Sequence, residues 1–242
     1  MPIQQTNRVT GDDTSSVARP SPGAASHPVF SLIVLTAPFF FSGEAAFLEG
    51  LLAAGLEKLH LRKPGADKEE MEALLQQIDV RWHPRLVLHP WAGRAGSCDA
   101  ALRLAARYGI PQIHCSLKEM GEPNVPKTEP IAGAPVAVSS SLHSWEEIKD
   151  IRGMGLTYVF LSPVFDSISK PGYGANPDLW LRPDRPYPCK VIGLGGVDKD
   201  SMGELIREGW DGAAVLGWIW EEPDRAVQRY KQLKKIIASH CL

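Results

Sequence analysis

Two glycine sites near the end of the chain have the spacing of a phosphate-binding pocket. Gly195 and Gly196 follow one apolar run, and Gly217 follows a second, residues 213–216, after a helix-length segment. Backbone N–H groups at glycine turns after neighbouring strands can donate to the oxygens of an anion. Either glycine site alone would fit an ordinary turn equally well. The pair predicts a phosphorylated small molecule as the ligand.

A second group of polar residues precedes these glycines. Ser167, Ser169 and Lys170 supply two hydroxyl donors and a positive charge, which suit an anion. Arg62, after an earlier apolar run, can bind a carboxylate or a second phosphate through two parallel N–H bonds. We expect these residues to contact the ligand. The alternative for Arg62 is that it forms a solvated pair with Lys63.

Three histidines, His60, His89 and His114, lie near the ends of apolar runs. Three imidazoles can bind zinc. No carboxylate ligand accompanies them, however, and neighbouring strands bring polar residues together in any case. We therefore expect no metal ligands among them.

The elements that position these residues repeat as strand and then helix from Phe30 onward, at the interval of a βα unit. Eight such strands predict an α/β protein with a closed (β/α)8 or TIM barrel, whose chemistry lies at the carboxyl ends of the strands. An open doubly wound sheet is the alternative, but the first strand lacks the glycine-rich turn of dinucleotide-binding folds. The predicted strands are 32–36, 58–61, 85–88, 112–114, 135–139, 158–161, 190–192 and 213–215, and the predicted helices are 44–54, 68–78, 98–108, 144–154, 199–208 and 223–238.

The composition favours one domain that binds a metabolite. The chain has 242 residues, 44% of them hydrophobic, with a formal net charge of -2. Residues 29–242 are expected to form the barrel, and residues 1–28, rich in Ser, Thr, Pro and Gly, a disordered tail without a signal-peptide core. The charge gives no argument for nucleic acid, and no apolar run is long enough to span a membrane. Whether the chain forms a homo-oligomer is left open.

Four cysteines are scattered along the chain, at positions 98, 115, 189 and 241. Their spacing fits neither a zinc ribbon nor a redox CxxC pair. We therefore expect reduced thiols and a cytoplasmic protein. Cys115 is adjacent to His114, and adjacent strand residues point to opposite faces, so a core thiol is favoured over a nucleophile.

From Leu32 to the last predicted helix, these motifs resemble the thiamine phosphate synthase/TenI family. Synthases carry Pro-Thr-x-Thr-Lys where this chain has Ser167-x-Ser169-Lys170. The resemblance implies that a thiazole phosphate is held by these serines and the backbone glycines, with Lys170 neutralising charge. It also implies that Arg62, Ser141 and Lys170 face the pyrimidine pyrophosphate in synthases. The other matching motifs are His60-Leu61-Arg62, Val138 to His143, Gly195-Gly196-Val197 and Asp211-Gly212-Ala213-Ala214-Val215.

The chain departs from the synthase pattern where synthases bind magnesium. Synthases carry Asn-Asp after the third strand and an Asp before the fourth-strand histidine; this chain has His89-Pro90 and Pro111. The glutamine after the fourth strand is also missing, and the lysine two residues after Arg62 is Pro64. A bound metal stabilises the negative charge that develops as pyrophosphate leaves by several kcal/mol. The loss of its ligands therefore argues against metal-assisted coupling.

TenI-type tautomerases share the fold and the thiazole phosphate but need only proton transfer, and no cofactor. Their acid/base histidine lies in a Ser-x-His-Ser-x-Glu-Glu segment, which His143 matches. Imidazole suits the task because it changes protonation near neutral pH. The resemblance thus implies a thiazole tautomerase with His143 as the catalytic residue, although a packing role for His143 is an alternative. The other hypotheses are a magnesium-dependent thiamine phosphate synthase, coupling hydroxymethylpyrimidine pyrophosphate to thiazole phosphate, and a non-catalytic phosphate-ligand sensor.

Overall fold

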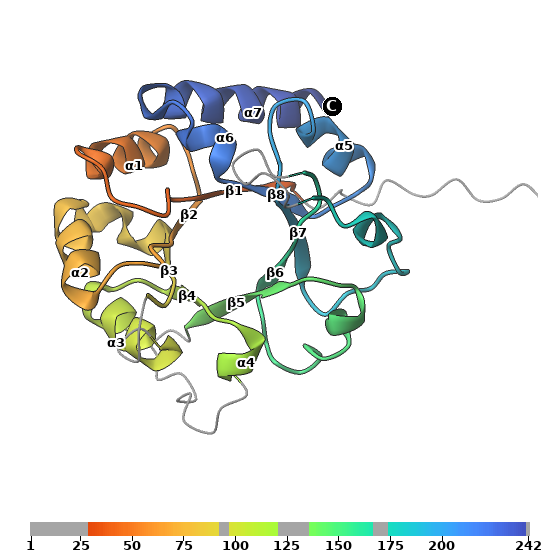
Figure 1. Ribbon diagram of the computed structural model, residues 1–242, viewed down its shortest axis with the longest axis horizontal. Helices are drawn as coiled ribbons and strands as arrows, with labels where there is room; N and C mark the ends of the chain where they lie inside the picture. Colours follow the sequence, from red (N-terminus) through yellow and green to blue (C-terminus); the bar gives the residue numbers. More distant parts are fainter. Residues whose placement is uncertain (1–28, 92–96, 121–135, 167–173, 241–242) are drawn as a thin grey trace, which may run out of the picture.

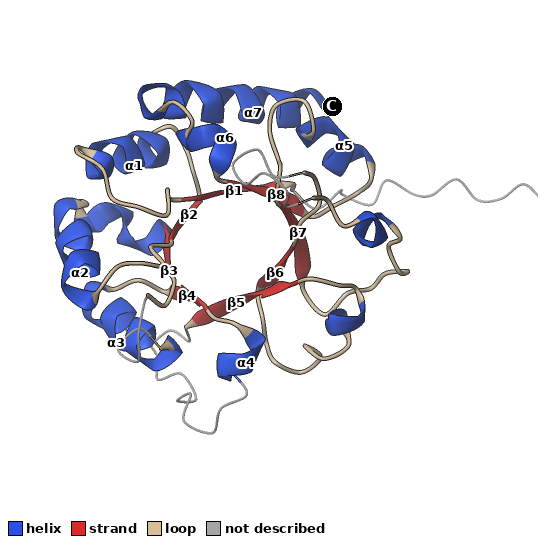
Figure 2. Ribbon diagram, viewed as in Figure 1, coloured by secondary structure: helices blue, strands red, loops and turns tan. Residues whose placement is uncertain are grey.

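The computed structural model describes residues 29–91, 97–120, 136–166 and 174–240. They form a closed barrel of parallel strands in sequence order, inside a layer of helices (Figures 1 and 2). The barrel closes where β1 pairs with β8, Ser31 lying opposite Gly212. The predicted (β/α)8 fold is confirmed. The strands are β1 Ser31–Leu35, β2 Lys58–Leu61, β3 Leu86–Leu88, β4 Gln112–His114, β5 Ala137–Leu142, β6 Tyr158–Leu161, β7 Lys190–Leu194 and β8 Gly212–Val215.

Two helices of the outer layer, α2 and α3, begin at side-chain caps. Asp67 and Glu70 form a reciprocal capping box at the start of α2, and the Ser97 hydroxyl caps α3. Gly109 ends α3 with a positive φ of 66°. The helices are α1 Glu44–Ala53, α2 Lys68–Gln77, α3 Cys98–Tyr108, α4 Leu117–Met120, α5 Met202–Arg207, α6 Gly217–Trp220 and α7 Ala226–His240, with short 3-10 turns η1 Val80–Arg85, η3 Glu146–Ile148, η4 Pro177–Trp180 and η5 Pro223–Arg225.

The helix predicted over 144–154 is wrong. Only the short turn η3 forms there, and Gly153 adopts a φ of 81°, which a continuous right-handed helix excludes. The Glu147 carboxylate accepts from the backbone N–H groups of His143 and Ser144. The strand before it is longer than predicted and runs to Leu142.

The interior of the barrel is divided between an apolar and a polar side. Six buried apolar residues from β1, β6, β7 and β8 pack against one another inside the barrel. On the side of β2 to β5, the buried residues include histidine, glutamine and serine. The apolar set is Ile33, Leu35, Tyr158, Phe160, Ile192 and Ala214, and the polar set includes His60, His89, Gln112, His114 and Ser139.

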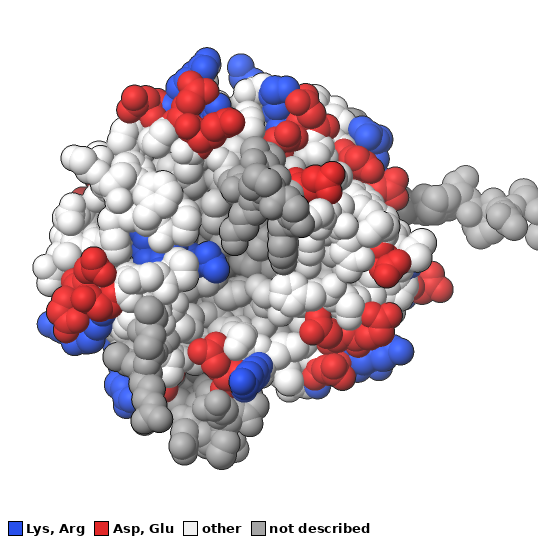
Figure 3. All heavy atoms as spheres, in the orientation of Figure 1, with Lys and Arg blue, Asp and Glu red and all other residues white. Residues whose placement is uncertain are grey.

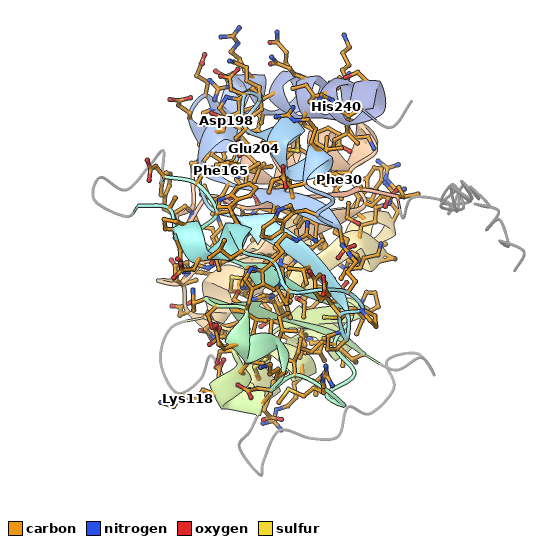
Figure 4. All side chains as sticks on the ribbon, turned by 90° about the vertical axis from the view of Figure 1, so that its right-hand side faces the viewer. Phe30, Lys118, Phe165, Asp198, Glu204 and His240 are labelled. Atoms are coloured by element: carbon orange, nitrogen blue, oxygen red, sulfur yellow. A yellow bond between two sulfur atoms is a disulfide. The ribbon has the colours of Figure 1, made fainter. Side chains whose placement is uncertain are left out.

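The amino ends and the carboxyl ends of the strands lie at opposite ends of the barrel. Figure 4 places Phe30, which precedes β1, at the opposite end from Phe165 and Asp198, which follow β6 and β7. The candidate site residues follow strands and so belong to the end of Phe165 and Asp198. None of the described helices has the length and apolarity needed to cross a bilayer.

The expectation of reduced thiols is wrong for two of the four cysteines. Cys98, the first residue of α3, and Cys115, the residue after β4, form a disulfide with their Cα atoms 5.8 Å apart. The fold brings them together because the chain runs from β3 through α3 into β4, which pairs with β3. The residue after β4 therefore lies beside the start of α3. Cys189 is a free thiol, and burial raises its pKa to about 11. Cys241 lies outside the described residues.

Candidate active site

Gly195 and Gly196 form a tight turn after β7, pressed against the loop that follows β6. Both have positive φ, 101° and 64°. The Phe165 N–H donates to the Gly195 carbonyl, and a Cβ at Gly196 would lie 2.2 Å from the Asp166 carbonyl oxygen. Only glycine permits this approach together with this backbone conformation. The turn and the β6 loop therefore form one continuous surface at the mouth of the barrel.

Gly217 begins the short helix α6 directly after β8. No side chain caps α6, whose N-cap residue is Leu216. Between the described residues, no hydrogen bond uses the amide of Gly196 or of Gly217 as donor. We call Gly195, Gly196 and Gly217 the glycine rim. It presents backbone amides at the carboxyl ends of β7 and β8, as a site for an anion requires.

His143 follows β5 and is held in one orientation by the neighbouring strand. Its Nδ1 lies 3.1 Å from the Ser162 carbonyl oxygen, so Nδ1 carries the proton and donates it. Among the described residues, no hydrogen bond reaches Nε2. The ring is exposed to solvent. Ser162 begins the β6 loop that packs on Gly195 and Gly196, so the same loop contacts His143 and these two glycines.

Three histidine rings, His60 from β2, His89 directly after β3 and His114 from β4, meet inside the barrel. His60 Nδ1 lies 2.8 Å from His89 Nε2, and the rings of His89 and His114 stack with centroids 4.3 Å apart. One nitrogen of each ring lies within 4.8 Å of the others. We call His60, His89 and His114 the histidine cluster.

Burial keeps the histidine cluster neutral. Desolvation lowers the pKa of His60 and of His89 well below the ordinary histidine value, and it lowers the pKa of His114 to about 3. The positive charges of Lys58, near His60, and Arg62, near His89 and His114, act in the same direction. At neutral pH these rings accept hydrogen bonds as well as donating them.

Arg62 and Lys63 are not a solvated pair, because Lys63 is completely buried. Its Nζ lies 2.5 Å from Glu44 Oε1 and donates to the carbonyls of Ala37 and Phe39. Arg62 is half-buried, and burial lowers the pKa of its guanidinium. Figure 3 shows Lys and Arg side chains beside the central hollow, on the side where Figure 1 places β2 and β3, with acidic side chains mainly at the periphery.

The predicted site residues divide into two groups at the mouth. Ser141 and Arg62 adjoin the histidine cluster, because the Ser141 hydroxyl lies 3.0 Å from His114 Nε2 and the Arg62 charge acts on His89 and His114. His143 contacts the β6 loop, which packs on Gly195 and Gly196. Ser167, Ser169 and Lys170 lie outside the described residues.

Sequence reasoning missed two parts of the site. Tyr158 donates to or accepts from His60 Nε2 at 2.5 Å, and the buried pair of Lys63 and Glu44 fixes the loop after β1. Tyr158 could have been found, since it alternates with Val159 along β6 and shares the inward face with Phe160. The ion pair joins residues 19 positions apart in sequence, and no local pattern indicates it.

The positions that correspond to the magnesium ligands of synthases do not fit magnesium. Pro90 and Pro111 have no donor atom in their side chains, and His89 offers nitrogen, whereas Mg²⁺ prefers oxygen ligands. Among the described residues, the group that could hold a metal consists of the three histidines, without a carboxylate. The arrangement therefore does not provide a magnesium centre of the synthase type.

Comparison with known proteins connects this geometry to one family. A family model described as thiamine monophosphate synthase matches residues 33–219. A thiamine-phosphate synthase of Listeria monocytogenes serotype 4b is 24% identical over 198 residues, covering 77% of this chain and 86% of the relative. A crystal structure of thiamine phosphate pyrophosphorylase from Bacteroides thetaiotaomicron is similar with a TM-score of 0.62 and 27% identity, over 86% of this chain and 98% of that one. A 3-hexulose-6-phosphate synthase, 16% identical, shares the fold with a TM-score of 0.58, over 86% of this chain and 99% of that one.

Proposed function

The chain belongs to the thiamine monophosphate synthase family, and on this premise we propose that it is a thiazole phosphate tautomerase with His143 as the proton-transferring residue. The substrate is a carboxythiazole phosphate with an exocyclic double bond, and the product is its aromatic isomer. The glycine rim binds the phosphate. No metal takes part in the proton transfer.

The observation that carries this proposal is the hydrogen bond from His143 Nδ1 to the Ser162 carbonyl. Because a histidine ring with Nδ1 protonated has its lone pair on Nε2, this bond prepares Nε2 as a general base. The same carbonyl belongs to the loop that packs on Gly195 and Gly196. A phosphate anchored at the glycine rim would thus hold the rest of a small substrate near His143.

The reaction conserves atoms and charge. His143 Nε2 takes a proton from the saturated ring carbon, and the electron pair of the broken C–H bond enters the ring. The double bonds rearrange within the ring, and the electron pair of the exocyclic double bond forms the new C–H bond with the proton that the imidazolium returns to the exocyclic carbon. The histidine returns to its starting state, and aromaticity drives the reaction forward. Imidazole is suited to both transfers because it is a competent base and acid near neutral pH.

The glycine rim would hold the phosphate through amides and not through a buried cation. The Gly196 and Gly217 N–H groups have no acceptor among the described residues, so they are available to phosphate oxygens. Ser167, Ser169 and Lys170, which follow β6 in sequence, are proposed to complete the site with two hydroxyl groups and a positive charge.

Synthase activity is the second candidate, favoured by the synthase names of the relatives and by Arg62 at the mouth. A pyrophosphate leaving group would need its developing charge offset, and the positions of the synthase magnesium ligands hold His89, Pro90 and Pro111. This favours proton transfer over coupling. No comparison favours a non-catalytic sensor.

One pair of assays on the full chain tests the proposal. The protein is incubated with the exocyclic thiazole tautomer alone, and separately with thiazole phosphate, hydroxymethylpyrimidine pyrophosphate and magnesium. We expect many turnovers of the tautomer to the aromatic isomer and no coupled product. Coupling without tautomerisation would replace the proposal by synthase activity, and turnover in neither assay, with saturable binding of thiazole phosphate, would favour a sensor.

A further inference from the structure

The histidine cluster has features of a metal site that the proposed tautomerase reaction does not use. His60 is fully buried, and His89 and His114 are each 7% exposed. Their ring nitrogens converge from three adjacent strands to within 4.8 Å of one another. A closed barrel holds strand positions rigidly, which is what a ligand set of fixed geometry requires.

Two rings in the cluster, those of His60 and His114, have hydrogen-bond partners outside the cluster that fix their orientation. His60 Nε2 bonds to the Tyr158 hydroxyl at 2.5 Å, which leaves Nδ1 facing His89. His114 lies 3.0 Å from Ser139 Oγ through Nδ1 and 3.0 Å from Ser141 Oγ through Nε2. Metal-ligating histidines usually have such a partner on the second ring nitrogen, because it sets the tautomer and the ring plane.

The donor atoms must shift modestly to bind one zinc ion. Zinc–nitrogen bonds of about 2.0–2.1 Å at tetrahedral angles separate ligand nitrogens by roughly 3.3 Å. The 2.8 Å separation of His60 Nδ1 and His89 Nε2 would have to widen by about half an ångström, and the longer separations, which reach up to 4.8 Å, would have to close by as much as about 1.5 Å. His114 would exchange one serine contact for the ion. These are side-chain adjustments and leave the strands in place.

We propose that His60, His89 and His114 bind a first-row transition-metal ion of the zinc class in the interior of the barrel. Three protein ligands leave a fourth position open, as in catalytic zinc centres. The nearby charges are the cations Lys58 and Arg62, so the ligand suited to the open position is an anionic oxygen, a carboxylate or a phosphate. Arg62 would bind the same anion.

The donor set selects this class of ion against magnesium. Imidazole nitrogen suits Zn²⁺, Co²⁺, Ni²⁺ and Cu²⁺, whereas Mg²⁺ and Ca²⁺ prefer oxygen. The sequence-based prediction of no metal rested on the absence of a carboxylate ligand. A zinc site with three histidine ligands does not need a carboxylate ligand. The site is thus distinct in chemistry from the magnesium site implied by the resemblance to synthases.

Titration with metal alone tests this inference without substrate. The full chain, with its disulfide intact, is freed of metal with a chelator and titrated with Zn²⁺ against a chromophoric competitor. Co²⁺ is added in a parallel experiment, because histidine-ligated cobalt of low coordination number absorbs visible light far more strongly than the hydrated ion. We expect one tightly bound equivalent of Zn²⁺, a strong Co²⁺ spectrum, and neither effect from Mg²⁺.

Variants assign the ion to the cluster. His89→Gln and His114→Gln each remove one ligand, and we expect the Kd for Zn²⁺ to rise at least about tenfold in each, the range seen even when an orienting partner is removed. His240→Ala is the matched control, since His240 is exposed at the end of α7 in the outer layer (Figure 4). Circular dichroism checks that each variant is folded.

The cobalt spectrum of the unmodified protein keeps the test decisive if a variant fails to fold. Absence of stoichiometric Zn²⁺ binding and of a strong Co²⁺ spectrum overturns the inference. Equal affinity in the folded cluster variants, or the same loss in His240→Ala, overturns it as well. Since no turnover is measured, failure here leaves the proposed tautomerase untouched.

Discussion

His60 Nδ1 and His89 Nε2 share one hydrogen bond of 2.8 Å in the interior of the barrel. One of these nitrogens must donate and the other accept, so the pair is compatible with neutral rings. A second proton would place two donors against each other, next to the cations Lys58 and Arg62 and the neutral Tyr158 hydroxyl. The cluster therefore makes the folded protein sensitive to acid.

We predict that the metal-free protein loses stability as the pH falls below about 6.5. Burial lowers the pKa of His60, His89 and His114 in the folded state, to about 3 for His114. The unfolded chain consequently binds more protons, and the stabilisation present above the ordinary histidine pKa is lost toward the folded-state values. The limiting slope is about 1.4 kcal/mol per pH unit for each histidine.

Urea unfolding between pH 7.5 and pH 5 measures this slope. His114→Gln should flatten it, whereas His240→Ala should retain it. Parallel curves for wild type and His114→Gln would show that the cluster does not carry the acid sensitivity.

Glu44→Gln should destabilise the protein by about 3–5 kcal/mol, because it leaves the completely buried Lys63 ammonium without its counter-charge. Lys63 also donates to the carbonyls of Ala37 and Phe39, so the loop between β1 and α1 should become more susceptible to proteolysis. Chemical unfolding gives the change in free energy.

The surface pair of Lys199 and Asp200 offers the control, and Asp200→Asn should change stability by less than about 1 kcal/mol. The double variant Glu44→Leu/Lys63→Met removes both charges and should be more stable than Glu44→Gln. If Glu44→Gln unfolds like wild type, the ion pair does not hold the loop.

Gly196→Ala should abolish binding of thiazole phosphate. The added Cβ would lie 2.2 Å from the Asp166 carbonyl oxygen, and the φ of 64° is unfavourable for alanine. The β6 loop must therefore move away from the glycine rim. Calorimetric titration with thiazole phosphate measures the loss.

Gly65→Ala is the matched substitution in the loop after β2, since a Cβ there meets no atom within 4 Å. It should bind the ligand like wild type. Undiminished affinity in Gly196→Ala would remove the glycine rim from the binding site.

The barrel could be predicted from sequence because its strands are short apolar runs separated by helical segments. The bounds of β2, β4 and β6 agree with the prediction residue for residue. β5 was predicted to end three residues too early, since Ser140 and Ser141 look like loop residues until the polar side of the interior is known. The helix over 144–154 failed because the chain leaves the right-handed helical conformation at Gly153, whose φ is 81°.

Long-range contacts account for what the sequence could not predict in the site. Ser141 was expected near a pyrimidine pyrophosphate, which stays a prediction, and the fold places its hydroxyl against His114. The disulfide between Cys98 and Cys115 depends on the return of α3 to the sheet. Residue types alone indicate the glycines and His143, but only the folded chain brings three histidines within reach of one ion.

The most direct measurement of the central claim is the rate of thiazole tautomerisation by wild type, His143→Ala and the control His240→Ala. We expect kcat for His143→Ala to fall by about 10²- to 10⁴-fold with little change in KM, because removing a general base slows proton transfer without removing the phosphate site. His240→Ala should match wild type. Equal rates in wild type and His143→Ala would contradict the assignment of His143 and, with it, the proposed mechanism.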